Sequence, residues 1–162
     1  MARLQKLPTL SIIIPTLNEA VHLPLLLADL HAWPYDFELT IVDGGSTDLT
    51  ISIATIQGLD VIKSPKKNRG YQLKIGASNA IGDWLLFLHA DSRLDSTWAK
   101  SIYKIIQNKI SEKFAWYFDF KIKKYNIEFR FLELAVALRS QFLQRPYGDQ
   151  GLLIHKDLYF NS

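Results

Sequence analysis

Three short apolar segments of the sequence each stop at a group of oxygen-bearing side chains. If these segments are neighbouring parallel strands, their carboxyl ends meet at one edge of a sheet, and all three groups face one crevice. Carboxylates there could bind a hard divalent cation, or accept hydrogen bonds from a base edge or from ribose hydroxyls. The segments are residues 10–14, 37–42 and 84–88, followed by the groups 15–19 (PTLNE), 43–48 (DGGSTD) and 89–91 (HAD).

Each group taken alone has a plain structural explanation. A turn of the Asp-Gly-Gly type is most often only a turn, and an aspartate at a strand end is more often a helix cap than a ligand. The combination of three such groups is harder to explain in this way. It favours a ligand site at the carboxyl edge of the predicted sheet.

A basic segment, residues 63–69 (KSPKKNR), could extend this site toward phosphate groups. The guanidinium of Arg69 can hold two phosphate oxygens at once, although an arginine in a solvated loop is the alternative. A second basic cluster, residues 121–124, is explained about as well by a solvated surface. The formal net charge of +3 is a mild excess, which suits phosphate-bearing ligands, nucleic acid or an anionic membrane surface. Nucleic acid is the weakest of these, because the basic residues form no continuous stripe with interleaved aromatics.

Several common kinds of site are missing from the sequence. The first predicted strand is not followed by the G-x-G-x-x-G pattern of dinucleotide-binding folds, and the phosphate loop G-x-x-x-x-G-K-[ST] is absent as well. The sequence holds no G-x-S-x-G nucleophile elbow. It also has no cysteine, which removes thiolate nucleophiles and thiolate metal sites. His22, His31 and His155 share no metal-ligand spacing.

Strand-like and helix-like segments alternate through the first two thirds of the chain. This alternation predicts an α/β fold with a mainly parallel sheet, and the 162 residues suit one domain with a substantial core. The first helix is expected after an N-cap at Asn18-Glu19, with Leu23, Leu26, Leu27 and Leu30 on its apolar face. The further expected strands are 59–62, 114–122 and 152–154, and the further helices are 48–57 (capped by Ser46 or Thr47), 70–80, 95–106 and 127–142.

The three strand-end groups, taken in order, resemble the successive signatures of the family 2 glycosyltransferases. The likeness lies in residues 11–19 (SIIIPTLNE), 42–48 (VDGGSTD) and 82–91 (GDWLLFLHAD), and it covers nearly the whole chain. Residues 69–73 (RGYQL) and 148–151 (GDQG) further resemble a small bacterial subgroup of that family. The resemblance implies the GT-A fold, a Rossmann-like arrangement of helices around a sheet. It also implies an inverting transferase that takes its sugar from a nucleotide-sugar donor.

The resemblance further implies roles for residues at the nucleoside and phosphate end of the site. Thr16, Glu19 and Asp43 would contact the nucleoside, where a carboxylate can form strong charge-assisted hydrogen bonds. Arg69 would approach the nucleotide from the basic segment, and Gln72 would support it.

At the reaction end, Asp91 matches the last acidic residue of the family's Asp-x-Asp motif and would bind Mg²⁺ or Mn²⁺. His89 stands where many relatives have the first aspartate of that motif. It could ligate the metal, contact the donor or pack at the rim, and we favour a polar contact to the donor. Asp149 stands in the place of the family's catalytic base, which deprotonates the attacking acceptor hydroxyl.

Two other functions stay open on the residues alone. One is a nucleotidyltransferase that makes nucleotide sugars, although its usual Gly-rich basic loop does not follow the first strand. The other is a non-catalytic nucleotide-sugar-binding module. Family members usually continue beyond the equivalent of Ser162, so we expect residues 1–162 to form a single catalytic domain without a C-terminal extension.

The expected partners are the nucleotide-sugar donor and an acceptor that is a lipid, a saccharide or a small molecule, with no nucleic acid. The N-terminus lacks the apolar core of a signal peptide, and no apolar run approaches the ~20 residues that cross a bilayer. We therefore expect a cytoplasmic location, with peripheral contact to the inner face of the membrane as an option. Residues 127–142 could touch a membrane or an acceptor lipid, although a helix facing the core is favoured.

Overall fold

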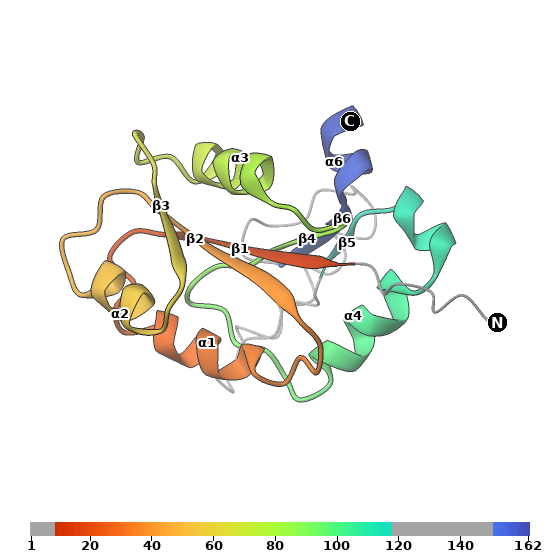
Figure 1. Ribbon diagram of the computed structural model, residues 1–162, viewed down its shortest axis with the longest axis horizontal. Coiled ribbons are helices and arrows are strands. Elements are labelled where there is room, and N and C mark those ends of the chain that lie inside the picture. Colours follow the sequence, from red (N-terminus) through yellow and green to blue (C-terminus); the bar gives the residue numbers. More distant parts are fainter. Residues whose placement is uncertain (1–8, 118–150) are drawn as a thin grey trace, which may run out of the picture.

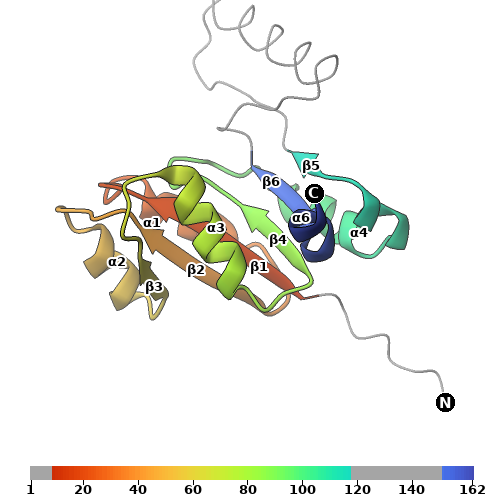
Figure 2. The same cartoon turned by 90° about the horizontal axis from the view of Figure 1, so that it is seen from above.

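The computed structural model describes residues 9–117 and 151–162. They form a six-stranded sheet in the order β3-β2-β1-β4-β6-β5, with helices on both faces (Figures 1 and 2). Strands β1 to β4 pair with one another in parallel, whereas β6 runs antiparallel to both β4 and β5. The strands are β1 (Leu10–Thr16), β2 (Phe37–Asp43), β3 (Asp60–Lys63), β4 (Trp84–Phe87), β5 (Trp116–Tyr117) and β6 (Leu152–His155). The predicted α/β class with a mainly parallel sheet is confirmed.

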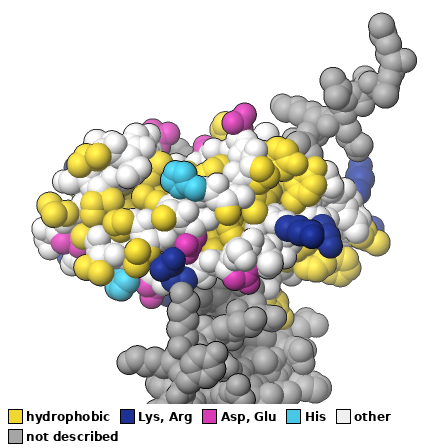
Figure 3. All heavy atoms as spheres, turned by 90° about the horizontal axis from the view of Figure 1, so that it is seen from below, with side chains coloured by type: hydrophobic (Ala, Val, Ile, Leu, Met, Phe, Trp, Pro, Cys, Tyr) yellow, Lys and Arg dark blue, Asp and Glu magenta, His cyan; other side chains and the backbone are white. Residues whose placement is uncertain are grey.

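Two helical layers cover the sheet. α1 (Leu23–Leu30), α2 (Thr50–Ile56) and α4 (Trp98–Ile106) lie on one face, and α3 (Arg69–Asn79) and α6 (Lys156–Asn161) lie on the other (Figure 1). A short 3₁₀ helix, η1 (Lys109–Lys113), follows α4. Figure 3 shows the first of these layers from outside, where apolar side chains are exposed between charged ones. Within the described residues, no helix is both long enough and apolar enough to span a membrane.

Strand β1 is the centre of the core because every one of its seven residues is buried. Ile12 and Ile14 face the layer of α1 and α4, whereas Ile13 faces α3. A β-branched residue suits this position because it packs well on a pleated surface, and each buried isoleucine contributes about 1.5–3 kcal/mol. This alternation builds one apolar core on each face of the sheet.

Helix α3 approaches the sheet closely at Gly76. A Cβ added there would lie 2.3 Å from Cγ2 of Ile13 and 3.2 Å from Cγ2 of Val42. No side chain can occupy that space without displacing the strand residues. Gly76 thus sets the distance between α3 and the carboxyl halves of β1 and β2.

Several predicted boundaries are wrong. The strands β1 and β2 run on to Thr16 and Asp43, so the first polar residue of each group belongs to the strand. Helix α1 has His22 rather than Asn18 at its N-cap, and α2 has Leu49 there, in both cases without a capping side-chain hydrogen bond.

The remaining differences lie toward the C-terminus. Of the predicted strand 114–122 only Trp116–Tyr117 falls in a described strand, and the predicted helix 127–142 lies outside the described residues. Helix α6 was not expected. The apolar stripe of α1 is confirmed, since Leu23, Leu26, Leu27 and Leu30 are all buried.

Candidate functional site

The carboxyl ends of β1, β2 and β4 lie side by side, as the sequence predicts. β1 is in the middle, paired in parallel with β2 up to Thr16 and Asp43, and with β4 up to Ile13 and Phe87. The backbone continues this pairing beyond the strands, because Gly44 N–H donates to the Thr16 carbonyl at 2.8 Å. The three polar groups therefore share one edge of the sheet.

Asp43 is buried at this edge, with 1% of its surface exposed, and its carboxylate accepts four hydrogen bonds. Oδ1 accepts from the hydroxyls of Thr16 (3.1 Å) and Ser46 (2.5 Å). Oδ2 accepts from the backbone N–H groups of Gly45 (2.8 Å) and Ser46 (2.9 Å). A carboxylate offers about four acceptor positions, so the protein's own donors use all of them.

The same bonds set the ionisation of Asp43. Burial alone would raise the pKa of this carboxyl, but the bonds from Ser46, Gly45 and Thr16 outweigh burial and hold the pKa below its ordinary value of 3.8. Gly45 makes the turn possible because its φ of 96° lies in the left-handed region that favours glycine. At neutral pH the site thus contains a buried, ionised carboxylate that shapes the loop after β2.

The loop after β1 and the loop after β2 are joined into one unit. Asn18 has a φ of 58°. Its N–H donates to the Ser46 hydroxyl at 2.9 Å, and its side-chain oxygen accepts from Thr47 N–H at 2.8 Å. Further along, Glu19 N–H donates to the buried Thr50 hydroxyl at 2.8 Å, and Ala20 N–H donates to Asp48 Oδ2 at 3.0 Å. These bonds fix the backbone from which the side chain of Glu19 projects.

Asp48 is exposed, yet it serves this junction as an ionised acceptor. Its Oδ1 accepts from both the hydroxyl (2.5 Å) and the N–H (3.0 Å) of Thr50. The Thr50 hydroxyl is the main reason why the pKa of Asp48 is lowered from its ordinary value. The Asp48 carboxylate therefore satisfies the first turn of α2 as well as the loop after β1.

Sequence reasoning missed the roles of Asn18, Ser46, Asp48 and Thr50. Their residue types were visible as loop and cap formers, but their partners lie about thirty residues away, on another loop. No local pattern specifies such a pairing.

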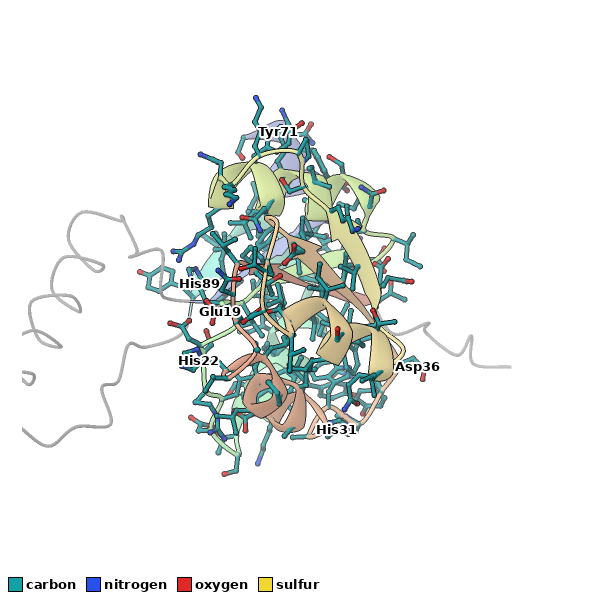
Figure 4. The ribbon with its side chains drawn as sticks, turned by 90° about the vertical axis from the view of Figure 1, so that its left-hand side faces the viewer. Glu19, His22, His31, Asp36, Tyr71 and His89 are labelled. Atoms are coloured by element: carbon teal, nitrogen blue, oxygen red, sulfur yellow. The ribbon has the colours of Figure 1, made fainter. Side chains whose placement is uncertain are left out.

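Glu19 lies at the rim of the edge. Its side chain is 28% exposed, and Oε2 lies 3.0 Å from Nδ1 of His22. In Figure 4, which looks onto the carboxyl ends of the strands, Glu19, His22 and His89 lie on one side of the molecule. Asp36 and His31 lie away from them in the same view. The predicted contact residues of the loops after β1 and β4 therefore share one side.

Gln72 lies beneath the strand ends, on α3. It is 4% exposed, and its Nε2 donates to the carbonyls of Thr16 (2.9 Å) and Val42 (2.7 Å). One amide nitrogen thus bonds to carbonyls near the carboxyl ends of two neighbouring strands. The structure places Gln72 under the site as a brace between β1 and β2.

Arg69 is exposed at the first position of α3, after the N-cap Asn68, whose side chain accepts from Tyr71 N–H at 2.9 Å. The basic segment before it reaches toward neighbouring parts of the edge. Lys66 Nζ lies 5.0 Å from the ring centroid of Tyr71. Cε of Lys67 would lie 3.6 Å from a Cβ atom placed on Gly45, so the Lys67 side chain packs near the loop after β2. The positive charge of the loop after β3 therefore borders the loop that Asp43 organises.

Asp91 is exposed in the segment after β4, and His89 is partly buried two residues before it. Within residues 9–117 and 151–162, no group of three or more histidine, aspartate or glutamate side chains could hold a metal ion by itself. Mg²⁺ and Mn²⁺ are nevertheless commonly held by one or two carboxylates together with water and substrate phosphates. A single exposed carboxylate on a sheet edge that a basic loop also borders fits that second kind of site.

The predicted base Asp149 lies outside the described residues, as does the loop 148–150 that contains it. Of the other predicted residues, the structure brings Thr16, Asp43 and Gln72 into direct contact. Glu19 follows β1, Arg69 begins α3 after β3, and His89 and Asp91 both follow β4, so these residues come from three segments at the carboxyl ends of parallel strands.

Comparison with known proteins agrees with this architecture. The sheet and its helices are those of the GT-A glycosyltransferases, which a mannosyltransferase from Pyrobaculum calidifontis in complex with GDP-Man and Mn²⁺ illustrates. That structure matches with a TM-score of 0.69 and 18% identity, over 95% of this chain and 46% of its own. The model of the Glycosyl transferase family 2 matches residues 11–136, so the chain belongs to this family.

Two further relatives match shorter parts. A PGL/p-HBAD biosynthesis glycosyltransferase of Mycobacterium bovis is 43% identical over 94 residues, which are 54% of this chain and 37% of that protein. A structure of S. aureus TarS 1-349 in complex with UDP matches with a TM-score of 0.55 and 26% identity, over 61% of this chain and 32% of its own. The chain thus spans well under half of the length of these relatives.

Proposed function

We propose that the chain forms the donor-binding region of an inverting glycosyltransferase, which moves a sugar from a nucleotide-diphospho-sugar to an acceptor hydroxyl with the help of Mg²⁺ or Mn²⁺. The observation that carries the proposal is the interlocked pair of loops after β1 and β2, which lies on the same sheet edge as Asp91 and borders the basic loop. Family membership and the solved relatives that hold UDP or GDP-Man support the same assignment.

At the nucleoside end, the loops of Thr16, Glu19 and Asp43 form the binding surface. The four acceptor positions of Asp43 are used by the protein, so a nucleoside N–H or hydroxyl has to share an oxygen with Ser46 or Thr16, or replace one of their hydroxyls. Glu19 has a partly exposed carboxylate at the rim and can accept from the ribose. Nucleoside binding at Asp43 therefore depends on the loop that positions Thr16 and Ser46 as well as on the charge of the carboxylate.

At the diphosphate end, Arg69 supplies a guanidinium that holds phosphate oxygens, and His89 contributes a polar contact. Asp91 would hold the divalent cation, which when bound neutralises the charge that develops on the departing diphosphate. Gln72 acts indirectly, because it fixes the carbonyls of Thr16 and Val42 and so the position of both strand ends.

The transfer itself is a displacement at the anomeric carbon. The acceptor oxygen forms a bond to that carbon while the bond to the diphosphate oxygen breaks and its electron pair leaves with the nucleoside diphosphate. The proton of the acceptor hydroxyl goes to the carboxylate of Asp149. Attack from the face opposite the leaving group inverts the configuration of the sugar.

The test is donor turnover. We expect the full-length protein to release nucleoside diphosphate from one of the UDP-, GDP- or dTDP-sugars with Mn²⁺, and to stop on addition of EDTA. Asp149→Asn should retain donor binding while turnover falls at least 10²-fold, since general base catalysis contributes about 10²–10⁴-fold. Donor binding without any turnover, across a panel of lipid, saccharide and small-molecule acceptors, would instead indicate a nucleotide-sugar-binding module.

A further inference from the structure

Asp29, near the end of α1, is the meeting point of several hydrogen bonds that come from the segment after β4. Arg93 donates to it through Nε (2.7 Å to Oδ2) and Nη2 (2.9 Å to Oδ1), in the two-pronged geometry that a guanidinium forms with a carboxylate. Leu94 N–H donates to Oδ2 at 3.0 Å, and Trp98 Nε1 donates to the Asp29 carbonyl at 3.1 Å. One residue of α1 thus binds three residues of the segment that leads into α4.

The arrangement differs from an ordinary surface ion pair. An exposed pair is worth little because solvent screens it and because two long side chains lose freedom. Here the Asp29 side chain is only 14% exposed, and it sits on a helix whose buried face is fixed in the core. The bond to Asp29 is also the main reason why the pKa of Arg93 is raised from its ordinary value. A backbone donor and a buried indole share the same acceptor residue, so the contact fixes the path of the chain.

The segment so held carries the predicted metal and donor contacts. It begins at Leu88, whose N–H donates to the Ile13 carbonyl at 3.1 Å. It ends at Trp98, whose ring stacks on that of Trp33 with 5.7 Å between the ring centroids. Between these points, Ala90 is buried, and Ser92 N–H closes a turn onto the His89 carbonyl at 3.0 Å. Asp91 is exposed on that turn, two residues before Arg93.

We infer that Asp29 is a positioning residue for Asp91: together with Arg93 it holds the turn of residues 89–92 so that the Asp91 carboxylate points out of the sheet edge toward the cation and the diphosphate. The inference rests on the proposed function. Asp29 itself touches neither substrate nor metal, and it acts through the backbone of residues 91–94. Such indirect support of a ligand is commonly worth about 10–100-fold in metal affinity.

The test combines a structural and a binding measurement on the full-length protein. The variants are Asp29→Asn, which keeps the shape of the side chain and loses its charge, and Arg93→Met. The matched control is Asp36→Asn, an exposed aspartate in the loop between α1 and β2. Amide hydrogen exchange over residues 89–94 reports the anchoring directly. Calorimetry with UDP, GDP and dTDP, each with and without Mn²⁺, reports its consequence.

We expect faster exchange of residues 89–94 in both variants and not in the control. We also expect the gain in nucleotide affinity that Mn²⁺ provides to fall about 10-fold, with metal-free nucleotide binding unchanged. A residue that served stability alone would weaken both kinds of binding together, or neither. Unchanged exchange, or an unchanged Mn²⁺ gain in either variant, would overturn the inference while leaving the proposed function standing. If the wild-type protein shows no Mn²⁺ gain at all, the metal-assisted function fails, and the inference fails with it.

Discussion

The carboxylate of Asp43 organises the loop after β2, and it is also the contact that we propose for the nucleoside. Its four hydrogen bonds hold the turn after β2, and the resulting loop in turn holds Asn18 and the backbone of Glu19. A ligand that approaches Asp43 meets a carboxylate that is already ionised and oriented. Because no reorganisation of the charge is needed, the cost of binding is confined to the exchange of a hydroxyl partner.

Replacing Asp43 by asparagine should destabilise the fold. The variant keeps one acceptor oxygen but places an amide group against backbone donors, and we expect a loss of about 1–3 kcal/mol at pH 7, the usual cost of leaving a buried polar group unsatisfied. Urea unfolding measures the difference in the free energy of unfolding. Ser92→Ala, on another loop of the same edge, is the control. Equal stability of Asp43→Asn and wild type would contradict the role given to these four bonds.

The same carboxylate has a defined pH dependence. Its pKa in the folded protein lies below the ordinary value of 3.8, so its contribution to stability is complete above that value and is lost as the pH falls through the folded pKa. The stability difference between wild type and Asp43→Asn should therefore shrink in acid, in the range below about pH 4. A difference that stays constant down to pH 2.5, in urea unfolding at several pH values, would show that the charge of Asp43 is irrelevant.

At the scale of elements, α3 is the part that sets the geometry of the edge. Its Gln72 braces the ends of β1 and β2, and its Gly76 lets the helix lie close enough for that side chain to reach both carbonyls. The sequence indicated the helix and the subgroup-like RGYQL segment, but not that Gln72 would be buried. The burial of Gln72 depends on the crossing of α3 over β1 and β2, which are distant from α3 in the sequence.

Gln72→Met tests the brace. The methionine has a similar length and removes the donor, so the carbonyls of Thr16 and Val42 lose a partner, at a cost of about 1–3 kcal/mol. The exposed Lys74→Met on the same helix should change stability by less than about 0.5 kcal/mol. Chemical denaturation measures both, and the nucleotide affinity of Gln72→Met should fall because the strand ends are no longer fixed. Full affinity in a destabilised variant would restrict Gln72 to a role in stability.

Gly76→Ala tests the spacing between α3 and the sheet. The added methyl group overlaps Cγ2 of Ile13, and overpacking of this kind costs about 1–3 kcal/mol. Ser78→Ala, exposed on the same helix, should instead be neutral or slightly stabilising, because alanine has the higher helix propensity. Thermal unfolding of both variants and of the wild type measures the change in melting temperature. A Gly76→Ala protein as stable as wild type would mean that the helix can move away from β1 at no cost.

At the scale of the whole molecule, the sequence predicted the fold class and the meeting of the three polar groups at one edge of the sheet. The continuous apolar run that forms β4 and the groups at Thr16, Asp43 and Asp91 were sufficient, because parallel strands bring their carboxyl ends together by topology alone. The junction between the loops after β1 and β2 could not be predicted, since Asn18–Thr47 and Ala20–Asp48 pair over about thirty residues. The helix starts were misplaced for the same reason: Asn18 and Ser46 bond to each other across the loops instead of capping their own helices. The single-domain organisation, the inversion, the base Asp149 and the cytoplasmic location remain predictions.

The central claim is that the carboxyl edge of the sheet binds the nucleotide donor, and nuclear magnetic resonance tests it most directly. The backbone amide signals of the isotope-labelled protein are recorded while UDP, GDP or dTDP is added in the presence of Mg²⁺. We predict that one nucleotide shifts the amides of residues 16–20, 43–48 and 89–94, and that those of the loop 33–36 stay unchanged. Shifts confined to regions away from the carboxyl edge, or none with any of the nucleotides at millimolar concentration, would contradict it.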